Sequence, residues 1–397
     1  MKNKELRIGV FFGSRSPEHD ISIITGQLII VGLKKLGYAV VPVYLDKAGK
    51  WMIGEELGEL KYFTNPLPNP PHKGEGMSEY YLDLEKSQGK LIFHKKGLFG
   101  SEIVIDLAFP AFHGANGEDG VPQGFFEIFN VPYVGCGVAA SAVAMDKILT
   151  KLFYKANGVQ TTEFLHYRVE EWNSNRQGIL NEIKQKMQFP LFVKPPLLGS
   201  SIGITKASND KSLEFGIEVA FHYGNTVLVE EGVENLMDIT CCVIGYNDPI
   251  PSALQESTYT EDFFSYDDKY INDGGAQTGN ATKSLVIPAR VDVTVAKEIQ
   301  ELSVKVFRLL GCTGIARFDF LYNKETKQYF ANEINPLPGT LYHHLWQKSG
   351  IELPDLLTKL LDFAQKAHQE KNKYTTTFES DILKQARGIK LKKDGAV

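Results

Sequence analysis

The chain has 397 residues, 43% of them hydrophobic, and 43 basic against 48 acidic side chains give it a formal net charge of −5. This ordinary globular composition excludes a disordered, collagen-like or coiled-coil chain. The small negative charge offers no basic surface for nucleic acid, and no apolar run approaches the roughly 20 residues that span a bilayer. We therefore expect neither nucleic acid nor a membrane as a partner. The length suggests about two to three domains, with ligands bound in the clefts between them.

The N-terminus and the cysteines indicate the compartment. Two lysines precede only a short apolar stretch, which leads into a glycine turn and is typical of a first strand rather than a signal peptide. We therefore expect a cytoplasmic protein. The cysteines lie in apolar surroundings without metal-ligand spacing, so we expect buried free thiols, with reactive cysteine chemistry as the minor alternative. They are Cys136, Cys241, Cys242 and Cys312.

The first third of the chain has the pattern of a parallel sheet. An apolar strand is predicted at residues 7–12, an amphipathic helix at 20–36 and a second strand at 38–46. Strand, helix and strand in this order form a βαβ unit, which indicates a doubly wound α/β domain. Residues 64–76 are so rich in proline and glycine that they are predicted to form a loop.

A polar, glycine-rich turn follows a later strand of the same domain. The strand is predicted at residues 103–112, the turn at 113–120 and a helix near 121–130. In an open parallel sheet such a turn lies at the carboxyl end of its strand, where ligands bind.

The pattern changes after residue 137. A helical stretch is predicted at about 139–157, a strand at 191–196, a Gly/Ser loop at 197–203 and a helix near 210–223. Strands dominate from residue 226, and a long polar loop at 256–283 precedes two helices beyond residue 293. We therefore predict a first domain at residues 1–137, a central domain at 138–225, a C-terminal domain at 226–370 and a polar, basic tail at 371–397.

Residues 314–339 contain the most informative pattern, two alternating segments around a polar turn that predict a β-hairpin. Because strand side chains alternate, Arg317 and Asp319 share one face, as do Glu333 and Asn335. Strand pairing would bring three oxygen donors together beside an arginine, an arrangement that suits Mg²⁺ rather than Zn²⁺. The alternative is a polar face on which Arg317 pairs with Asp319 for structural reasons only.

Two lysines and a loop have the chemistry of a phosphate site. Lys147 begins a helical stretch, and Lys194 ends an apolar strand directly before small residues at 199–203. Lysines supply positive charge to phosphates, and small residues let backbone N–H groups approach them. No Walker A sequence occurs, and a loop of this kind is by itself more often a flexible turn. Together with the hairpin, it favours a lid over bound phosphate.

Several motifs in a fixed order resemble one family. They are GSRSPEHDIS (13–22), HGANGEDGVPQGFFE (113–127), AMDK (144–147), FVKPPLLGSSIG (192–203), YDDKY (266–270), GCTGIARFDF (311–320) and NEINPLPG (332–339). Together they resemble the D-alanine–D-alanine ligase family of ATP-grasp enzymes, from about residue 7 to about residue 365. The resemblance implies an α/β fold in which a Rossmann-like N-terminal domain precedes two α+β domains that clasp ATP.

The resemblance further implies an activity. The family uses ATP with Mg²⁺ or Mn²⁺ to phosphorylate the carboxylate of one D-alanine, and the amine of a second D-alanine then attacks the acyl phosphate. The dipeptide serves peptidoglycan synthesis, and with it cell wall formation and cell shape. The resemblance also implies a homodimer.

Roles for individual residues follow from the matching motifs. ATP would be bound by Lys147, Lys194, Ser200, Ser201, Glu230, Glu231 and Asp238. Mg²⁺ would be held by Asp319, Glu333 and Asn335, while Arg317 and the backbone N–H of Gly339 would stabilise the tetrahedral oxyanion.

The resemblance implies substrate residues as well. Glu18 would hold the ammonium of the first substrate, linked through Ser200 to Tyr270, and His113 would lie beside that substrate. Lys269 would recognise the carboxylate of the second substrate. Two of these residues have simpler alternatives, since Glu18 could be an acid favoured at a helix N-terminus and His113 could merely cap its turn.

The chain departs from the family in three places. His344 stands where a serine that binds the second substrate is expected, and His343 and His344 could instead make only structural hydrogen bonds in an aromatic pocket. Asp238 is shorter than the usual glutamate, which weakens the expected contact with a ribose hydroxyl. The segment 51–102 is long and has no functional interpretation.

Three hypotheses follow. The leading one is a ligase that joins two D-alanines. The second is an ATP-grasp ligase of the same mechanism with another amino acid or a hydroxy acid as acceptor, motivated by His344. The third is a nucleotide-binding pseudoenzyme, which the presence of both lysines and all three metal-ligand candidates disfavours.

Overall fold

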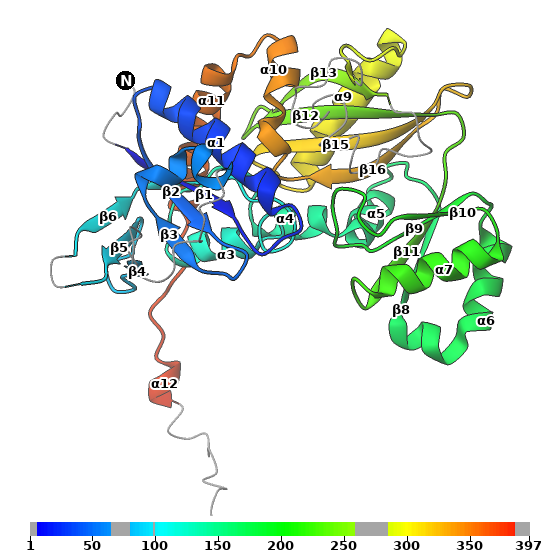
Figure 1. The fold of residues 1–397 in the computed structure, drawn as a ribbon, viewed down its shortest axis with the longest axis horizontal. Coiled ribbons are helices and arrows are strands. Elements are labelled where there is room, and N and C mark those ends of the chain that lie inside the picture. Colours follow the sequence, from blue (N-terminus) through cyan, green and yellow to red (C-terminus); the bar gives the residue numbers. More distant parts are fainter. Residues whose placement is uncertain (1–5, 65–79, 98–99, 259–284, 386–397) are drawn as a thin grey trace, which may run out of the picture.

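The computed structural model describes residues 6–64, 80–97, 100–258 and 285–385, which form four sheets with helices packed against them (Figure 1). The predicted loops at 64–76 and 256–283 fall largely outside these residues. No helix in the described ranges is both long and apolar enough to cross a membrane.

The N-terminal sheet confirms the predicted βαβ unit. Its strands run in the order β3-β2-β1-β7, with β1 parallel to both neighbours and β3 antiparallel to β2. The elements are β1 (Arg7–Gly13), α1 (His19–Lys35), β2 (Ala39–Leu45), β3 (Trp51–Ile53), β7 (Leu107–Pro110) and α3 (Val121–Ile128). The turn after β7 therefore lies at the carboxyl end of a parallel strand, as predicted.

The predicted strand at 103–112 is wrong as one element, because the chain passes there from one sheet to another. Residues before Asp106 form β6 (Glu102–Ile105), in an antiparallel sheet with β4 (Tyr80–Leu82) and β5 (Leu91–Lys95). The Asp106 carboxylate accepts hydrogen bonds from the backbone N–H of Arg7 at 2.9 Å and from its Nε at 3.0 Å. This small sheet and the short helices η1 (Glu55–Gly58) and α2 (Lys61–Thr64) occupy much of the segment 51–102.

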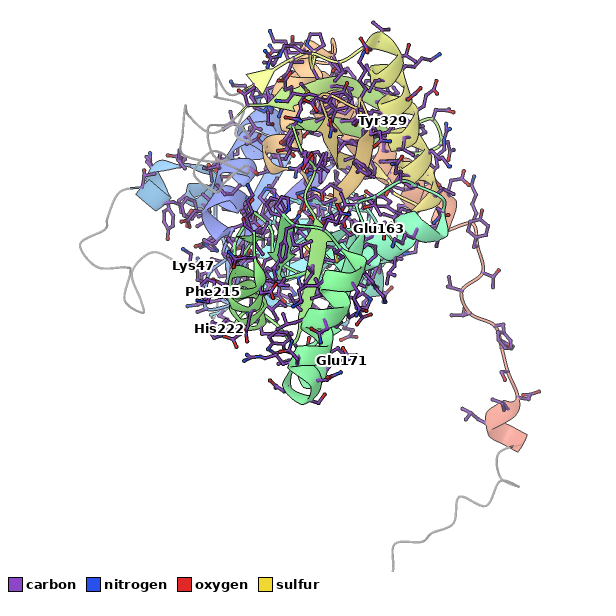
Figure 2. The ribbon with its side chains drawn as sticks, turned by 90° about the vertical axis from the view of Figure 1, so that its right-hand side faces the viewer. Lys47, Glu163, Glu171, Phe215, His222 and Tyr329 are labelled. Carbon is purple, nitrogen blue, oxygen red and sulfur yellow. The ribbon has the colours of Figure 1, made fainter. Side chains whose placement is uncertain are left out.

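The central part is an antiparallel sheet of order β10-β9-β11-β8 with its own apolar core. Its elements are β8 (Phe164–Arg168), α6 (Val169–Lys186), β9 (Leu191–Lys194), β10 (Thr205–Ala207), α7 (Asp210–Phe221) and β11 (Thr226–Glu231). Figure 2 shows Glu171 and Phe215 on the outer side of α6 and α7. Because β11 pairs with β8 and β9, the predicted domain boundary at residue 225 comes too early.

The C-terminal sheet is antiparallel in the order β14-β13-β12-β15-β16. Its strands are β12 (Leu236–Gly245), β13 (Ile250–Ser257), β14 (Leu285–Val286), β15 (Gly314–Asn323) and β16 (Tyr329–Asn335). One face packs against α4 (Val138–Met145), α5 (Lys147–Ala156) and α9 (Val293–Leu309). The helical stretch predicted at 139–157 is therefore two helices, and it packs on the C-terminal sheet rather than in the central domain where it was predicted.

The N-terminal and C-terminal parts share a core. After the turn η4 (Gly339–Tyr342), the helices α10 (His343–Lys348) and α11 (Leu353–Lys371) pack among residues of β1, α1 and β12. Leu357, for example, joins the same apolar cluster as Ile8 and Ile244. Beyond α11 the chain runs away from the body to the short helix α12 (Ile382–Gln385) (Figure 1). The central part therefore packs around a core of its own, whereas the N- and C-terminal parts are joined by a shared core.

Candidate active site

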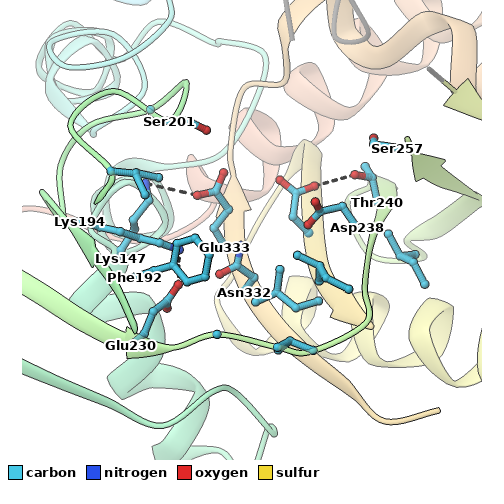
Figure 3. Close-up of a pocket in the computed structure, with 18 of the residues that line it drawn as sticks. Lys147, Phe192, Lys194, Ser201, Glu230, Asp238, Thr240, Ser257, Asn332 and Glu333 are labelled. Atoms are coloured by element: carbon cyan, nitrogen blue, oxygen red, sulfur yellow. Dashed lines mark hydrogen bonds and ion pairs between the residues drawn. The ribbon is translucent and has the colours of Figure 1, made fainter. Parts of the chain in front are cut away.

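A cavity lies between the central sheet and the C-terminal sheet (Figure 3). Apolar side chains of both sheets, including Phe192 and Leu321, supply surfaces on which a flat ring can lie. Most of the residues predicted to bind ATP or to act in catalysis line this cavity, namely Lys147, Lys194, Ser200, Ser201, Glu230, Glu231, Asp238, Arg317, Asp319 and Glu333. The fold thus brings together residues from distant parts of the chain.

The hairpin of β15 and β16 supplies the acidic side of the cavity. Asp319 and Glu333 face each other across the two strands, and Arg317 lies opposite Asn335 in the next pair on the same face. Alternation places Arg317 with Asp319 on β15 and Glu333 with Asn335 on β16, and a register shift between Asp319 and Phe320 brings the two pairs onto one face. The predicted hairpin is confirmed.

Arg317 forms a close ion pair with Asp319. Its Nε lies 3.0 Å from each carboxylate oxygen, and Nη2 lies 2.7 Å from Oδ2. Thr240 Oγ1 donates to Asp319 Oδ1 at 2.9 Å, and Nη2 of Arg317 lies 3.7 Å from Glu333. The structural pairing considered from the sequence is thus present. The ion pair with Asp319 does not use every donor of the guanidinium, since the buried Nη1 of Arg317 has no hydrogen-bond partner among the described residues.

The donor set suits a hard cation. In the described ranges no group of three or more His, Cys, Asp and Glu side chains could hold a metal ion by itself. Asp319 and Glu333 offer two carboxylates at the cavity, and Mg²⁺ is commonly held by one or two carboxylates together with substrate phosphates. The residues therefore fit Mg²⁺ bound with a nucleotide. Asn335 does not line the cavity, and its Oδ1 accepts a hydrogen bond from the N–H of Leu337 at 3.0 Å.

Lys147 reaches the cavity from the first turn of α5. The helix begins there because the carboxylate of Asp146 accepts hydrogen bonds from the N–H groups of Ile148 and Leu149, a typical N-cap. The Nζ of Lys147 donates to the carbonyl of Leu198 at 2.8 Å and lies 3.3 Å from Glu333 Oε2. It therefore connects the Gly/Ser loop with the acidic hairpin.

Lys194, at the end of β9, supplies the second cation. Its Nζ contacts Glu230 on β11, whose other carboxylate oxygen lies 2.8 Å from the buried ammonium of Lys151. Burial raises the pKa of the Glu230 carboxyl, but the two lysines more than offset this and lower it to about 2. Glu230 is therefore a fixed negative charge at the cavity wall.

The Gly/Ser loop crosses from the central part to the N-terminal part. Ser200 and Ser201 adopt φ angles of 56° and 61°, and Ser200 Oγ donates a hydrogen bond to Glu18 Oε1. A Cβ on Gly199 would lie 2.7 Å from Oε2 of Glu18, and one on Gly114 would lie 2.8 Å from the same atom. Both glycines are therefore required for the close approach of the Glu18 carboxylate.

His113 lies in a buried cluster on the N-terminal side. Its Nε2 lies 2.8 Å from Thr25 Oγ1, which accepts a hydrogen bond from the N–H of Thr340 at 3.0 Å. Burial, together with the charge of Arg317, lowers the pKa of His113 to about 3, so its imidazole is neutral. The contact with Thr25 ties His113 to the segment that follows Gly339.

The segment after Gly339 has unusual backbone geometry. Thr340, Leu341 and Tyr342 all have φ angles between 48° and 55°, a region in which side chains other than glycine cost about 1–2 kcal/mol each. Tyr342 places its ring 5.1 Å from the guanidinium carbon of Arg317. Strain of this kind occurs at functional sites, and here the strained segment directly follows Gly339 and places Tyr342 beside Arg317.

His344 lies outside the cavity lining. Its Nε2 is 2.7 Å from Gln255 Oε1, and its ring centroid is 5.0 Å from that of Tyr342. Burial, together with the neighbouring His343, lowers its pKa to about 4. These contacts match the structural alternative considered for His344. Lys269 and Tyr270 lie outside the described residues.

Sequence reasoning missed several buried polar groups around the site. They are Thr25, Glu118, Lys151, Thr240 and Gln255. Glu118 accepts a hydrogen bond from the N–H of Gly114 at 2.8 Å, and its Oε2 has no partner within the described ranges. Burial and the charge of Glu18 raise its pKa well above the usual range. Lys151 was detectable, because it falls between Ile148 and Tyr154 on the apolar stripe of α5.

Glu231 and Asp238 lie where ATP is expected to bind. Glu231 accepts a hydrogen bond from the N–H of Gln188 at 2.8 Å, and Asp238 lines the cavity from β12. The predicted buried free thiols are confirmed, since all four cysteines are unpaired and buried.

Comparisons with known proteins identify the family. A model described as D-ala D-ala ligase N-terminus matches residues 7–136, and one described as D-ala D-ala ligase C-terminus matches residues 153–362. The D-alanine–D-alanine ligase of Thermosipho africanus (strain TCF52B) is 34% identical over 378 residues, covering 95% of this chain and 98% of that relative. The ligase of Natranaerobius thermophilus is 34% identical over 379 residues, covering 94% and 99%.

Solved structures agree in fold. The D-alanine-D-alanine ligase from Coxiella burnetii superimposes with a TM-score of 0.77 at 26% identity, covering 97% of this chain and 98% of that one. The VanG D-Ala:D-Ser ligase from Enterococcus faecalis gives 0.75 at 28% identity, covering 91% and 99%. The predicted ATP-grasp fold is thereby confirmed. The chain belongs to the D-alanine–D-alanine ligase family.

Proposed function

We propose that the protein joins two D-alanine molecules in an ATP-dependent reaction that releases ADP and phosphate. One observation carries this proposal. Two lysines, Lys147 and Lys194, converge on the cavity where the hairpin presents Arg317, Asp319 and Glu333. Cations for a triphosphate, carboxylates for Mg²⁺ and a donor for an oxyanion are the groups that carboxylate activation by ATP requires.

In the first step, a carboxylate oxygen of the first D-alanine attacks the γ-phosphorus of ATP, and the bond from that phosphorus to the bridging oxygen of ADP breaks. Lys147 and Lys194 hold the phosphates, and the loop with Ser200 and Ser201 covers them. Asp319 and Glu333, which line the cavity, would hold Mg²⁺, which when bound neutralises phosphate charge. Asn335 stays a third ligand candidate from the family motif.

In the second step, the amine of the second D-alanine attacks the carbonyl carbon of the acyl phosphate. The carbonyl oxygen becomes an oxyanion, to which the free Nη1 of Arg317 and the N–H of Gly339 donate. The C–O bond to phosphate then breaks, the amine loses its proton, and the dipeptide and inorganic phosphate leave. The transferred carboxylate oxygen leaves with the phosphate.

The first substrate binds on the N-terminal side of the cavity. Glu18, fixed by Ser200, accepts its ammonium group, and the neutral His113 lies beside it. Lys269 is proposed to recognise the carboxylate of the second substrate, and Tyr270 to be linked through Ser200 to Glu18. The role in peptidoglycan synthesis follows from the family. The homodimer stays a prediction from the family, and the cytoplasmic location stays a prediction from the N-terminal sequence.

A panel assay tests the proposal. Purified full-length protein is given ATP, Mg²⁺ and single D- or L-amino acids, ADP release is followed, and products are identified by mass spectrometry. We expect ADP and D-alanyl-D-alanine with D-alanine alone. ADP release without this dipeptide would reject D-alanine as acceptor, and no ADP release with any amino acid would favour the pseudoenzyme.

A different acceptor is the second candidate, and His344 favours it. A protein at 28% identity to this chain is described as a D-Ala:D-Ser ligase, so one fold serves ligases with different acceptors. In this chain, however, the Nε2 atom of His344 lies 2.7 Å from Gln255 Oε1, so the imidazole already has a partner within the protein. We therefore favour D-alanine. A His344→Ser variant with an altered acceptor preference in the same panel would favour the second candidate.

A further inference from the structure

Lys151 is a buried cation that the proposed mechanism does not use. It lies on α5 one turn after Lys147, and its side chain is 1% exposed. Its Nζ lies 2.8 Å from Glu230 Oε2, 2.8 Å from Thr162 Oγ1 and 3.0 Å from Thr161 Oγ1. An ammonium has three N–H donors, so these contacts satisfy all of them.

Glu230 connects this buried lysine with the cavity. Its side chain is 2% exposed, one carboxylate oxygen contacts Lys151, and the other contacts Lys194. Both lysines lower the pKa of Glu230, which stays ionised. Figure 3 shows Lys194 and Glu230 on the same wall of the cavity. Lys151 is not among the cavity-lining residues of the described chain, and the contact that connects it with the cavity runs through Glu230.

The charges of this cluster can be added. Lys194 and Glu230 alone would be a neutral pair, because the negative charge of the carboxylate cancels the positive charge of the lysine. With Lys151 the cluster carries one net positive charge, and Lys194 is its member on the cavity side. A buried charge whose partner is removed is strongly unfavourable, so Glu230 without Lys151 would hold Lys194 more firmly. Lys151 therefore increases the positive charge that Lys194 presents to a phosphate.

We propose that Lys151 is a positioning residue that neutralises Glu230 and so keeps the charge of Lys194 available for the phosphates of the nucleotide. The proposal rests on the proposed function in one respect, the assignment of Lys194 to the ATP phosphates. The competing explanation is purely structural, with Lys151 fastening α5 to β11. Only the first explanation makes nucleotide affinity depend on the net charge of the cluster.

The first test removes the charge. In the full-length protein, Lys151→Met is compared with Lys155→Met, which removes the same charge one turn later on the same helix. Lys155 is 45% exposed and pairs with Glu163, which lies at the surface (Figure 2). Affinity for a non-hydrolysable ATP analogue is measured by calorimetry, together with KM for ATP and D-alanine and the thermal unfolding midpoint.

We expect Lys151→Met to bind the analogue roughly tenfold more weakly, the scale of one lost charge-assisted contact. KM for ATP should rise in parallel, KM for D-alanine should stay within about twofold, and Lys155→Met should behave like wild type. Analogue affinity is measurable whatever the second substrate is, so the result is separate from the test of dipeptide formation. Unchanged analogue affinity in Lys151→Met would overturn the proposal.

The second test restores the charge balance. Lys151→Met combined with Glu230→Gln removes both charges behind Lys194 and returns the cluster to one net positive charge. Replacing a whole buried ion pair is tolerated better than removing one partner, so this variant also controls for folding. Because Glu230 is itself assigned to ATP binding, Glu230→Gln alone is the reference for the double variant. We expect Lys151→Met to weaken analogue binding far less in the Glu230→Gln protein than in the wild-type protein. An equal loss in both proteins, or failure of Lys151→Met and the double variant both to fold, would assign Lys151 a structural role.

Discussion

Ser200 Oγ donates a hydrogen bond to Oε1 of Glu18, although the two residues are 182 positions apart in the chain. Ser200 belongs to the loop that covers the proposed phosphate site, and Glu18 precedes α1 in the N-terminal part. The bond therefore joins the loop over the nucleotide to the residue proposed to bind the first substrate. We therefore propose that closure over ATP and recognition of D-alanine depend on the same contact.

Replacing Ser200 tests this coupling. Ser200→Ala removes the hydroxyl group that donates to Glu18, and a hydrogen bond to a charged group contributes about 1.5–3 kcal/mol. We expect kcat/KM for D-alanine to fall roughly 10- to 100-fold, while analogue affinity for the nucleotide changes far less. The control is Ser208→Ala, an exposed serine after β10. Steady-state kinetics with D-alanine varied at saturating ATP measures kcat/KM for both variants, and calorimetry measures their affinity for the ATP analogue. A wild-type kcat/KM in Ser200→Ala would contradict the coupling.

Arg317 is predicted to act on the oxyanion. Arg317→Lys keeps a positive charge beside Asp319 but removes the planar guanidinium that supplies the free Nη1. Loss of one oxyanion donor costs roughly 10²- to 10³-fold in kcat. The matched control is Arg290→Lys, because Arg290 also pairs with a carboxylate, that of Glu256, away from the hairpin. Rapid-quench measurement of dipeptide formation checks this prediction. If kcat of Arg317→Lys falls less than tenfold, Arg317 has only its structural pairing with Asp319 and no role at the oxyanion.

The hairpin was predictable from the sequence because its geometry is local. Alternation fixes which side chains of one strand share a face, and a short polar turn joins the two strands. The pairing of Asp319 with Glu333 also depends on a register shift between Asp319 and Phe320, which the sequence pattern does not specify. The boundary near residue 225 was not predictable in the same way. An apolar strand such as β11 fits either sheet by its sequence, and only tertiary packing places it between β9 and β8.

Buried polar contacts were the least predictable part of the site. Nothing near Glu118 in the sequence shows that one of its oxygens is unpaired in the interior. Lys151 gave one signal, its place on an apolar helix stripe, but its partner Glu230 lies on a strand far along the chain. Such contacts depend on distant elements, which a local pattern does not specify.

The hairpin carboxylates should control the metal requirement. Glu333→Gln removes one charged ligand candidate, so we expect the Mg²⁺ concentration for half-maximal activity to rise roughly tenfold or more. Glu325→Gln, an exposed change in the turn of the same hairpin, is the control. Removal of metal with EDTA should abolish turnover, and Mg²⁺ or Mn²⁺ should restore it. An unchanged metal dependence in Glu333→Gln would remove Glu333 from the metal site.

His113 should make the fold sensitive to acid. Its pKa is lowered to about 3 by burial and by the charge of Arg317, whereas an unfolded histidine has a pKa near 6.5. Unfolding below pH 6.5 therefore takes up a proton at this residue, so its contribution to stability is complete above pH 6.5 and is lost as the pH falls toward 3. By pH 5 the loss is about 2 kcal/mol.

Chemical denaturation at pH 7 and pH 5 measures this loss, with His113→Gln as the comparison. Glutamine does not titrate, so the variant should lose about 2 kcal/mol less between the two pH values. The exposed His222→Gln serves as a control, and it should follow the wild-type pH dependence. Equal losses in wild type and His113→Gln would show that the imidazole takes up no proton on unfolding.

The most direct test of the account follows the carboxylate oxygen. D-alanine carrying ¹⁸O in both carboxylate oxygens is given to the protein with unlabelled ATP and Mg²⁺, and inorganic phosphate and dipeptide are analysed by mass spectrometry. The account predicts one ¹⁸O in each phosphate released and one in the new amide carbonyl of each dipeptide, because the attacked carboxylate gives one oxygen to the γ-phosphorus. Dipeptide formed with unlabelled phosphate would contradict carboxylate phosphorylation in the cavity between Lys147, Lys194 and the Asp319–Glu333 hairpin.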